Sequence, residues 1–259
     1  SIGTNAKLLV NGAMVAKTGG AAITPYGIIE VAAGYLEATP GSGITTREAG
    51  QLIVTGGEVW MPQFRTSIFG SSAQGGYQQD GGSTYIGDFT NGPVTGGSSS
   101  SASNDFYTMS LTYAGNSFDM SGGTLYVQDQ TSKGLVFINC DPDNISVTGG
   151  TVVLTSSNSL EAIVTSKAPF YNATLRASSG SAGHFMLKSG TTGTSDSRTL
   201  VTQDLRVVND LIVMGYGGST FTNANNSLGD FAATLEASSL DDLGTGDTSD
   251  DSLYVADVY

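Results

Sequence analysis

The feature that most constrains the fold is a short motif that occurs three times, in which two glycines separate two short apolar segments. The copies read IVTGGEVWM over residues 53–61, DMSGGTLYV over residues 119–127 and SVTGGTVVL over residues 146–154. Glycine has no Cβ atom and adopts bends that other residues resist. Each copy therefore predicts a strand, a sharp corner and a second strand.

The strand after each glycine pair shows which residues share a face. Side chains alternate between the two faces of a strand, so its first and third apolar residues point the same way. We expect the middle residue of each copy (Trp60, Tyr126 and Val153) to point outward. The residues predicted to point into a core are Val59, Met61, Leu125, Val127, Val152 and Leu154.

The spacing of the copies indicates a solenoid. Gly149 follows Gly122 by 27 residues, and the segment ATLRASS at residues 173–179 returns as ATLEASS at residues 233–239. Repeats of this length are typical of solenoids, and a coil of this size holds three short strands. The 66 residues between Gly56 and Gly122 leave room for three coils, or for fewer with an inserted loop. We predict an all-β chain with one domain over residues 1–259, a right-handed parallel β-helix; the alternative is a β-sandwich or jelly roll.

Short apolar segments separated by Gly, Asp, Asn or Ser predict the individual strands. Two segments lack this pattern: residues 70–104 are rich in Gly and Ser, and residues 240–252 contain five aspartates. We interpret the first as a long excursion from one coil and the second as an acidic loop. The predicted strands are residues 7–10, 27–31, 35–38, 107–111, 124–127, 135–138, 145–147, 151–154, 162–164, 174–177, 185–187, 205–208, 211–214, 231–237 and 253–258.

Composition excludes several classes of partner. The formal net charge of −13 argues against binding nucleic acid or an anionic membrane surface, because both reward Lys and Arg patches. No run of apolar residues is long enough to span a bilayer. Cys140 is the only cysteine, so an internal disulfide is impossible, and we expect an inert thiol.

The segments SGGTLYV and TGGTVVL resemble the repeats of right-handed β-helix surface proteins, namely autotransporter passengers and autotransporter-associated β-strand repeats. The resemblance covers residues 50–61 and 118–154. It implies an architecture and no particular activity, because such folds carry adhesins, lyases and inert stalks.

The sequence offers few groups for catalysis or metal binding. Asp141 and Asp143, with Asp129 and Lys133 upstream, are candidates for the paired carboxylates of a polysaccharide hydrolase. The segment DPDN at residues 141–144 is also an ordinary turn sequence, which accounts for both aspartates. His184 is the only histidine, and the acidic run 241–251 lacks the spacing of an EF-hand, although carboxylates suit calcium. We predict no catalytic residue, no cofactor and no metal site.

The ends of the predicted solenoid suggest a function. The apolar segments 7–10 and 253–258 are able to pair, and neither terminus shows an amphipathic helix that would cover them. We expect a non-catalytic, secreted structural protein of the cell surface or extracellular space that assembles head to tail into a filament or fibre. Its partners would be copies of itself, with surface glycans as a further possibility. The alternatives are a carbohydrate-binding or carbohydrate-cleaving β-helix, as in tailspikes and lyases, and an adhesin domain with its binding loops in residues 70–104.

Overall fold

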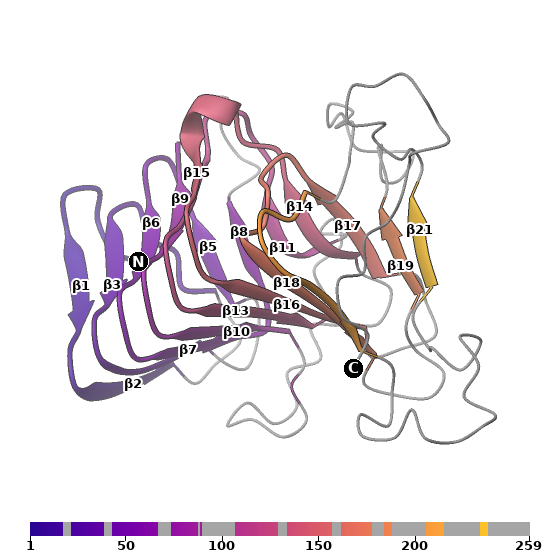
Figure 1. Cartoon of the computed structure of the whole chain (residues 1–259). Coiled ribbons are helices and arrows are strands. Elements are labelled where there is room, and N and C mark those ends of the chain that lie inside the picture. Colours follow the sequence, from indigo (N-terminus) through magenta and orange to yellow (C-terminus); the bar gives the residue numbers. More distant parts are fainter. Residues whose placement is uncertain are drawn as a thin grey trace.

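The chain forms a three-sided parallel β-solenoid (Figure 1). Its computed structural model describes residues 1–17, 22–38, 43–66, 74–87, 89, 107–128, 134–156, 162–177, 184–187, 206–214 and 234–237. The strands of each sheet pair in parallel between neighbouring coils, for example Leu125 with Val152 and Phe118 with Ile145. Parallel pairing confirms the predicted β-helix and excludes the sandwich and jelly roll, whose sheets are antiparallel.

Three sheets run along the solenoid, and a complete coil contributes one strand to each of them. Sheet 1 contains β1 (Lys7–Val10), β3 (Ile28–Val31), β6 (Gln51–Val54), β9 (Gly76–Gln79), β12 (Ser117–Met120) and β15 (Ile145–Val147). Sheet 2 contains β2 (Ala13–Lys17), β4 (Gly34–Ala38), β7 (Glu58–Met61), β10 (Ser83–Ile86), β13 (Thr124–Gln128), β16 (Thr151–Ser156), β18 (Asn172–Ala177) and β20 (Leu211–Met214). Sheet 3 contains β5 (Ile44–Thr46), β8 (Phe64–Thr66), β11 (Tyr107–Leu111), β14 (Gly134–Ile138), β17 (Ala162–Ser166), β19 (His184–Leu187) and β21 (Thr234–Ala237).

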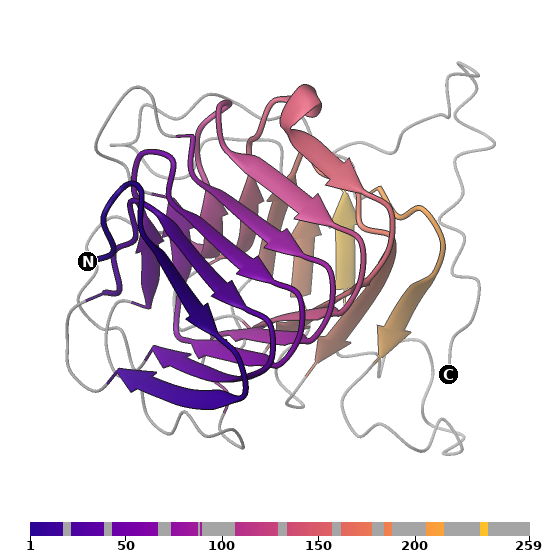
Figure 2. The same cartoon turned by 90° about the vertical axis from the view of Figure 1, so that its left-hand side faces the viewer.

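The solenoid is right-handed, as predicted. Seen from its N-terminal end in Figure 2, the chain runs clockwise through sheets 1, 2 and 3 while it recedes from the viewer. This is the hand that right-twisted strands favour when a connection returns to the same sheet in parallel.

The core is built from columns of apolar side chains that stack from coil to coil. The first inward column of sheet 2 passes through Leu36, Val59, Thr84, Leu125 and Val152, each the register partner of the next. Between sheets 3 and 1, Phe64 meets Tyr77 edge-on with ring centroids 5.5 Å apart. The six residues predicted to point inward are all at most 1 % exposed, which confirms the strand register: Val59, Met61, Leu125, Val127, Val152 and Leu154.

The glycine pairs form the corner between sheets 1 and 2, where the backbones of neighbouring coils come closest. A Cβ atom on Gly122 would lie 2.5 Å from the carbonyl oxygen of Asp80 in the preceding coil. Gly123 has a φ of +71°, which L-residues rarely adopt, and its Cβ would lie 2.5 Å from the carbonyl oxygen of Gly81. A non-glycine residue at either position would therefore push the two coils apart.

One coil lies inside the segment that we predicted to be an excursion. Residues 74–87 contain β9 and β10, joined by a fourth glycine pair, Gly81 and Gly82, so the prediction for residues 70–104 is wrong there. The inward positions of this coil hold Tyr77, Gln79 and Thr84, which disguises the apolar alternation. The 66 residues between Gly56 and Gly122 therefore correspond to two coils. The rest of residues 70–104, except Phe89, lies outside the described residues.

Most of the other predicted strands are present. The structure adds β2, β5 and β8, which sequence patterns had not indicated. Residues 206–208 contain only an isolated bridge at Val207 instead of a strand. The predicted strand at 253–258 and the acidic loop at 240–252 lie outside the described residues.

A pair of alanine substitutions separates the two constraints on the corner glycines. Gly12 and Gly123 both have positive φ, +75° and +71°, but a Cβ on Gly12 would have no atom within 4 Å. We expect Gly12→Ala to lower the free energy of unfolding by about 1–2 kcal/mol through backbone strain alone. Gly123→Ala should cost clearly more, as measured by urea unfolding. Equal losses would show that close stacking of the coils does not constrain this corner.

Candidate assembly surface

The N-terminal end of the solenoid presents strands with an unpaired edge. Among the described strands, β1 pairs only with β3 and β2 only with β4, so both are edge strands. The amides of Ile28 and Ala32 donate to the carbonyl oxygens of Ala6 and Val10, so these β1 carbonyls face β3. Backbone groups alternate along a strand, and the N–H and C=O groups of Lys7 and Leu9 therefore point away from β3. They form a row of groups able to pair with another strand.

The same end of the molecule has a half-covered apolar core. Ile2, Leu8, Val15 and Ile23 pack against the core but remain partly exposed. Ile2 forms an isolated parallel bridge with Pro25, and Ile23 forms one with Ile44. The two bridges continue the parallel pairing between coils outside the named strands. We call these four residues, together with the outer edges of β1 and β2, the N-terminal edge.

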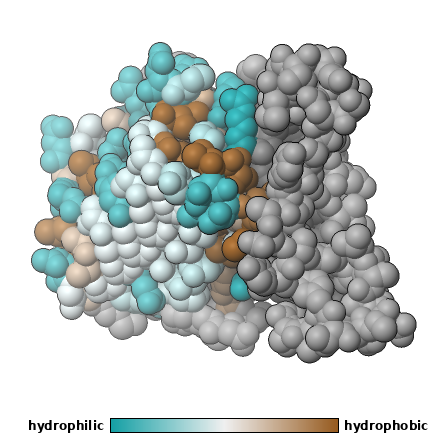
Figure 3. Space-filling view, in the orientation of Figure 1, coloured by the Kyte–Doolittle hydropathy of each residue, from teal (hydrophilic) through white to brown (hydrophobic). Residues whose placement is uncertain are grey.

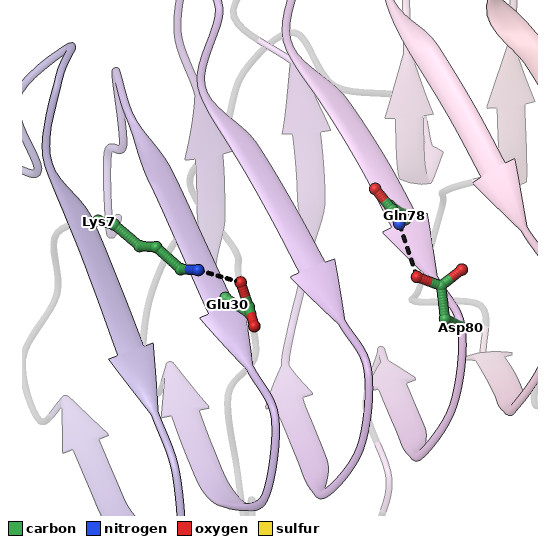
Figure 4. Close-up of polar contacts among 4 residues, drawn as sticks. All are labelled: Lys7, Glu30, Gln78 and Asp80. Carbon is green, nitrogen blue, oxygen red and sulfur yellow. Dashed lines mark hydrogen bonds and ion pairs between the residues drawn. The ribbon is translucent and has the colours of Figure 1, made fainter.

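An ion pair lies beside this edge and not across it. The ammonium group of Lys7 pairs with the carboxylate of Glu30 on the outer face of sheet 1 (Figure 4). Lysines on edge strands usually discourage further pairing because a new strand would bury their charge. Here the charge of Lys7 is compensated on the outer face, so the edge itself stays open to a further strand.

The outward aromatic residues of sheet 2 stack on one another. Trp60 and Tyr85 have ring centroids 3.8 Å apart, and Tyr85 and Tyr126 have centroids 4.6 Å apart with nearly parallel planes. Phe89 packs edge-on against Trp60 and Tyr85, and Trp60 is only 8 % exposed. Trp60 and Tyr126 do point outward as predicted, but Trp60 is covered.

Stacking within this aromatic column occupies part of the ring surface that a bound sugar would use. A sugar or other flat ligand stacks on the face of a ring, and both faces of Tyr85 are occupied by Trp60 and Tyr126. The indole Nε1 of Trp60 donates to Glu58 Oε2 at 3.2 Å, and the hydroxyl of Tyr35 donates to Glu37 Oε2 at 3.1 Å. Burial raises the pKa of Tyr35, and the nearby carboxylates of Glu37 and Glu58 raise it further.

The two described carboxylates among the predicted catalytic candidates lie on an exposed turn. Asp141 and Asp143 are exposed, at the 3-10 turn η1 (Pro142–Asn144). Asp129 and Lys133 lie outside the described residues, and the structure does not describe the side chain of His184. Cys140 is fully buried, and burial raises its pKa to about 12, which keeps the thiol protonated. The absence of enzymatic activity stays a prediction.

A carboxylate pair that sequence patterns had not indicated lies on the outer face of sheet 1. Burial raises the pKa of Asp119, and the nearby Asp80 carboxylate raises it further. Asp80 accepts hydrogen bonds from Gln78 Nε2 at 2.6 Å (Figure 4) and from Ser121 Oγ at 2.7 Å. The pair becomes visible only with the register, which places Gln78 beside Asp119, 41 positions further along the chain. Within the described residues, no group of three or more His, Cys, Asp or Glu could hold a metal ion.

Comparisons with known proteins found nothing similar to this chain. No family model matches the chain, and searches of curated proteins and of solved structures found no match. The β-helix architecture implied by the sequence resemblance is present, whereas membership of an autotransporter family has no support from these comparisons. In the described part of the chain, no helix is long and apolar enough to cross a bilayer.

Removing the half-buried charge of Asp119 should stabilise the protein in a pH-dependent way. Because its folded pKa is raised above the unfolded value of about 3.9, ionisation favours the unfolded state as the pH rises through this range. We expect Asp119→Asn to raise the free energy of unfolding at pH 7, and the gain to vanish near pH 3. Asp143→Asn, at the exposed η1 turn, is the control and should give no such gain. Urea unfolding at both pH values measures the effect, and a gain that persists at pH 3 would contradict it.

Proposed function

We propose that this chain is a non-catalytic structural protein of the cell exterior that stacks head to tail on copies of itself and so builds a filament. The observation that carries the proposal is the N-terminal edge, where β1 and β2 expose unpaired backbone groups beside a half-covered core. In such a filament, the last coil of one subunit would lie on the first coil of the next.

A second copy suits this edge because the edge already has the geometry of a coil-to-coil contact. Every interior coil pairs with its neighbours in parallel and buries apolar columns against them. A new coil would satisfy the outward backbone groups of Lys7 and Leu9, each hydrogen bond contributing about 0.5–1.5 kcal/mol. It would also cover Ile2, Leu8, Val15 and Ile23, at about 25 cal/mol per Å² of apolar surface buried. A contact between two different ends repeats without closing, which gives an open filament.

Sequence features support the remaining parts of the proposal. Low charge with abundant Gly, Ser and Thr is common in exported surface fibres, and the glycine-pair motifs resemble repeats of β-helix surface proteins. The two aspartates considered for hydrolysis, Asp141 and Asp143, lie exposed at the η1 turn, where an ordinary turn sequence accounts for them, which supports a structural role. Binding of surface glycans stays a prediction that no contact in the structure favours.

A proline at position 9 tests the edge without disturbing the subunit. The backbone N–H of Leu9 points away from β3 and its side chain is 51 % exposed, so neither supports the fold. Proline removes this donor and places its ring at the edge where the next strand would pair. We expect the unaltered protein to form filaments in negative-stain micrographs, and we expect Leu9→Pro to abolish them while it keeps the urea midpoint of the subunit.

The matched control is Leu9→Ala, which removes the same side chain but keeps the N–H group. Filaments should persist in this variant. Deleting residues 253–259, the strand predicted for the opposite end, should also leave β-rich single subunits. Filaments of Leu9→Pro, or an unaltered protein that stays a single subunit at high concentration, would show that the N-terminal edge is not an assembly surface.

A further inference from the structure

The ion pair beside the N-terminal edge joins the edge strand to the second coil. Lys7 lies on β1 and Glu30 on β3, and the register places Glu30 next to Leu9 and therefore diagonally across from Lys7. The lysine side chain crosses from β1 towards β3 to reach this carboxylate (Figure 4). Its ammonium group is thus held on the side of β1 that faces away from the open edge.

Lys7 has no second acidic residue beside it on this face. In the first three coils, the described residues on the outer face of sheet 1 include one acid, Glu30; the others are Lys7, Leu9, Ile28, Gln51 and Ile53. Asp80 and Asp119 belong to the fourth and fifth coils, at least three coil spacings or about 14 Å from β1. Residues 1–17, which form the first coil, contain two lysines and no Asp or Glu. Within the described part of sheet 1, the charge of Lys7 is therefore compensated at position 30.

The direction of the Lys7 side chain matters because β1 is an edge strand. A lysine on an edge opposes further pairing, since an arriving strand removes water from its ammonium group. The Lys7 side chain is 47 % exposed, and the neighbouring Leu9 is 51 % exposed. At the left of Figure 3, hydrophilic and hydrophobic residues lie side by side at this end of the molecule. The long, flexible stem of a lysine is able to carry its charge either towards β3 or out over the edge.

We propose that Glu30 controls assembly, because its carboxylate holds the Lys7 ammonium group back towards β3 and so keeps the N-terminal edge able to accept the next subunit. The proposal rests on the head-to-tail filament proposed above and concerns the control of that same contact. Glu30 is a positioning residue that acts through Lys7, because its own strand β3 is already paired on both sides, with β1 and β6. Without the carboxylate, an arriving strand would meet an uncompensated charge whose desolvation is costly.

Glu30→Gln tests this control, because glutamine keeps the shape of the side chain and removes its charge. We expect the critical concentration for filament formation, measured by sedimentation, to rise about two- to fivefold, which is the range of a partly exposed ion pair. The double variant Lys7→Gln/Glu30→Gln should return to the value of the unaltered protein, since it leaves no charge at this place on the edge. Glu48→Gln removes an exposed carboxylate from the turn between β5 and β6 and is the matched control, with no expected change.

Salt provides a second readout that separates positioning from a general loss of stability. The rise caused by Glu30→Gln should shrink in about 1 M salt, where the Debye length falls to about 3 Å and the charge of Lys7 is screened. A variant that merely weakened the subunit would raise the critical concentration at low and high salt alike, and the second substitution at Lys7 would not restore it.

The outcomes distinguish this control from the filament itself. Equal critical concentrations for the unaltered protein and Glu30→Gln, or a rise that persists in the double variant, would overturn the role of Glu30 and leave the head-to-tail filament standing. A complete lack of filaments from the unaltered protein would overturn both proposals.

Discussion

The close approach of backbones at the corner between sheets 1 and 2 is the constraint on which the rest of the structure depends. At Gly122 and Gly123, a single Cβ atom would come within 2.5 Å of a carbonyl oxygen in the preceding coil. Because the corner is bare, the carbonyl of Gln79 is able to accept two amides from the next coil, Ser121 and Gly122. This contact fixes the register of sheets 1 and 2 together, and the apolar columns follow from that register. Glycine is therefore placed here by the stacking of coils and not by flexibility.

The same stacking determines what the first coil leaves unpaired. A coil is complete only when both of its neighbours are present, so the first coil leaves the outward groups of Lys7 and Leu9 and the half-covered Leu8 and Val15. The aromatic residues Trp60, Tyr85 and Tyr126 stack on one another within the subunit, on the outer face of sheet 2.

The architecture was predictable from sequence because the same glycine-pair motif, which indicates a sharp corner between two strands, recurs at Gly56, Gly122 and Gly149. The coil at residues 74–87 was missed because Gln79 occupies an inward position that Val54 and Met120 fill in the adjacent coils. Its amide group is satisfied by backbone carbonyls, with Nε2 donating to Thr124 O at 3.0 Å and to Gly82 O at 3.2 Å, which no local pattern reveals. The surfaces were harder to predict. The lack of a cap led us to expect an open edge. The covering of Trp60 and the pair of Asp80 and Asp119 depend on which coils are neighbours, and a local sequence pattern does not reveal that.

The most direct test of end-to-end stacking is the axial repeat of the assembled protein, measured by fibre diffraction or cryo-electron microscopy. If the coils continue from one subunit to the next, the strand spacing of about 4.8 Å must run unbroken along the filament axis. Sheet 2 has eight described strands, so each subunit should occupy at least about 38 Å along the axis. A 4.8 Å repeat parallel to the axis, with a subunit repeat of that size or somewhat more, is the predicted result. Filaments whose strands run along the axis, or subunits joined by their sides alone, would contradict it.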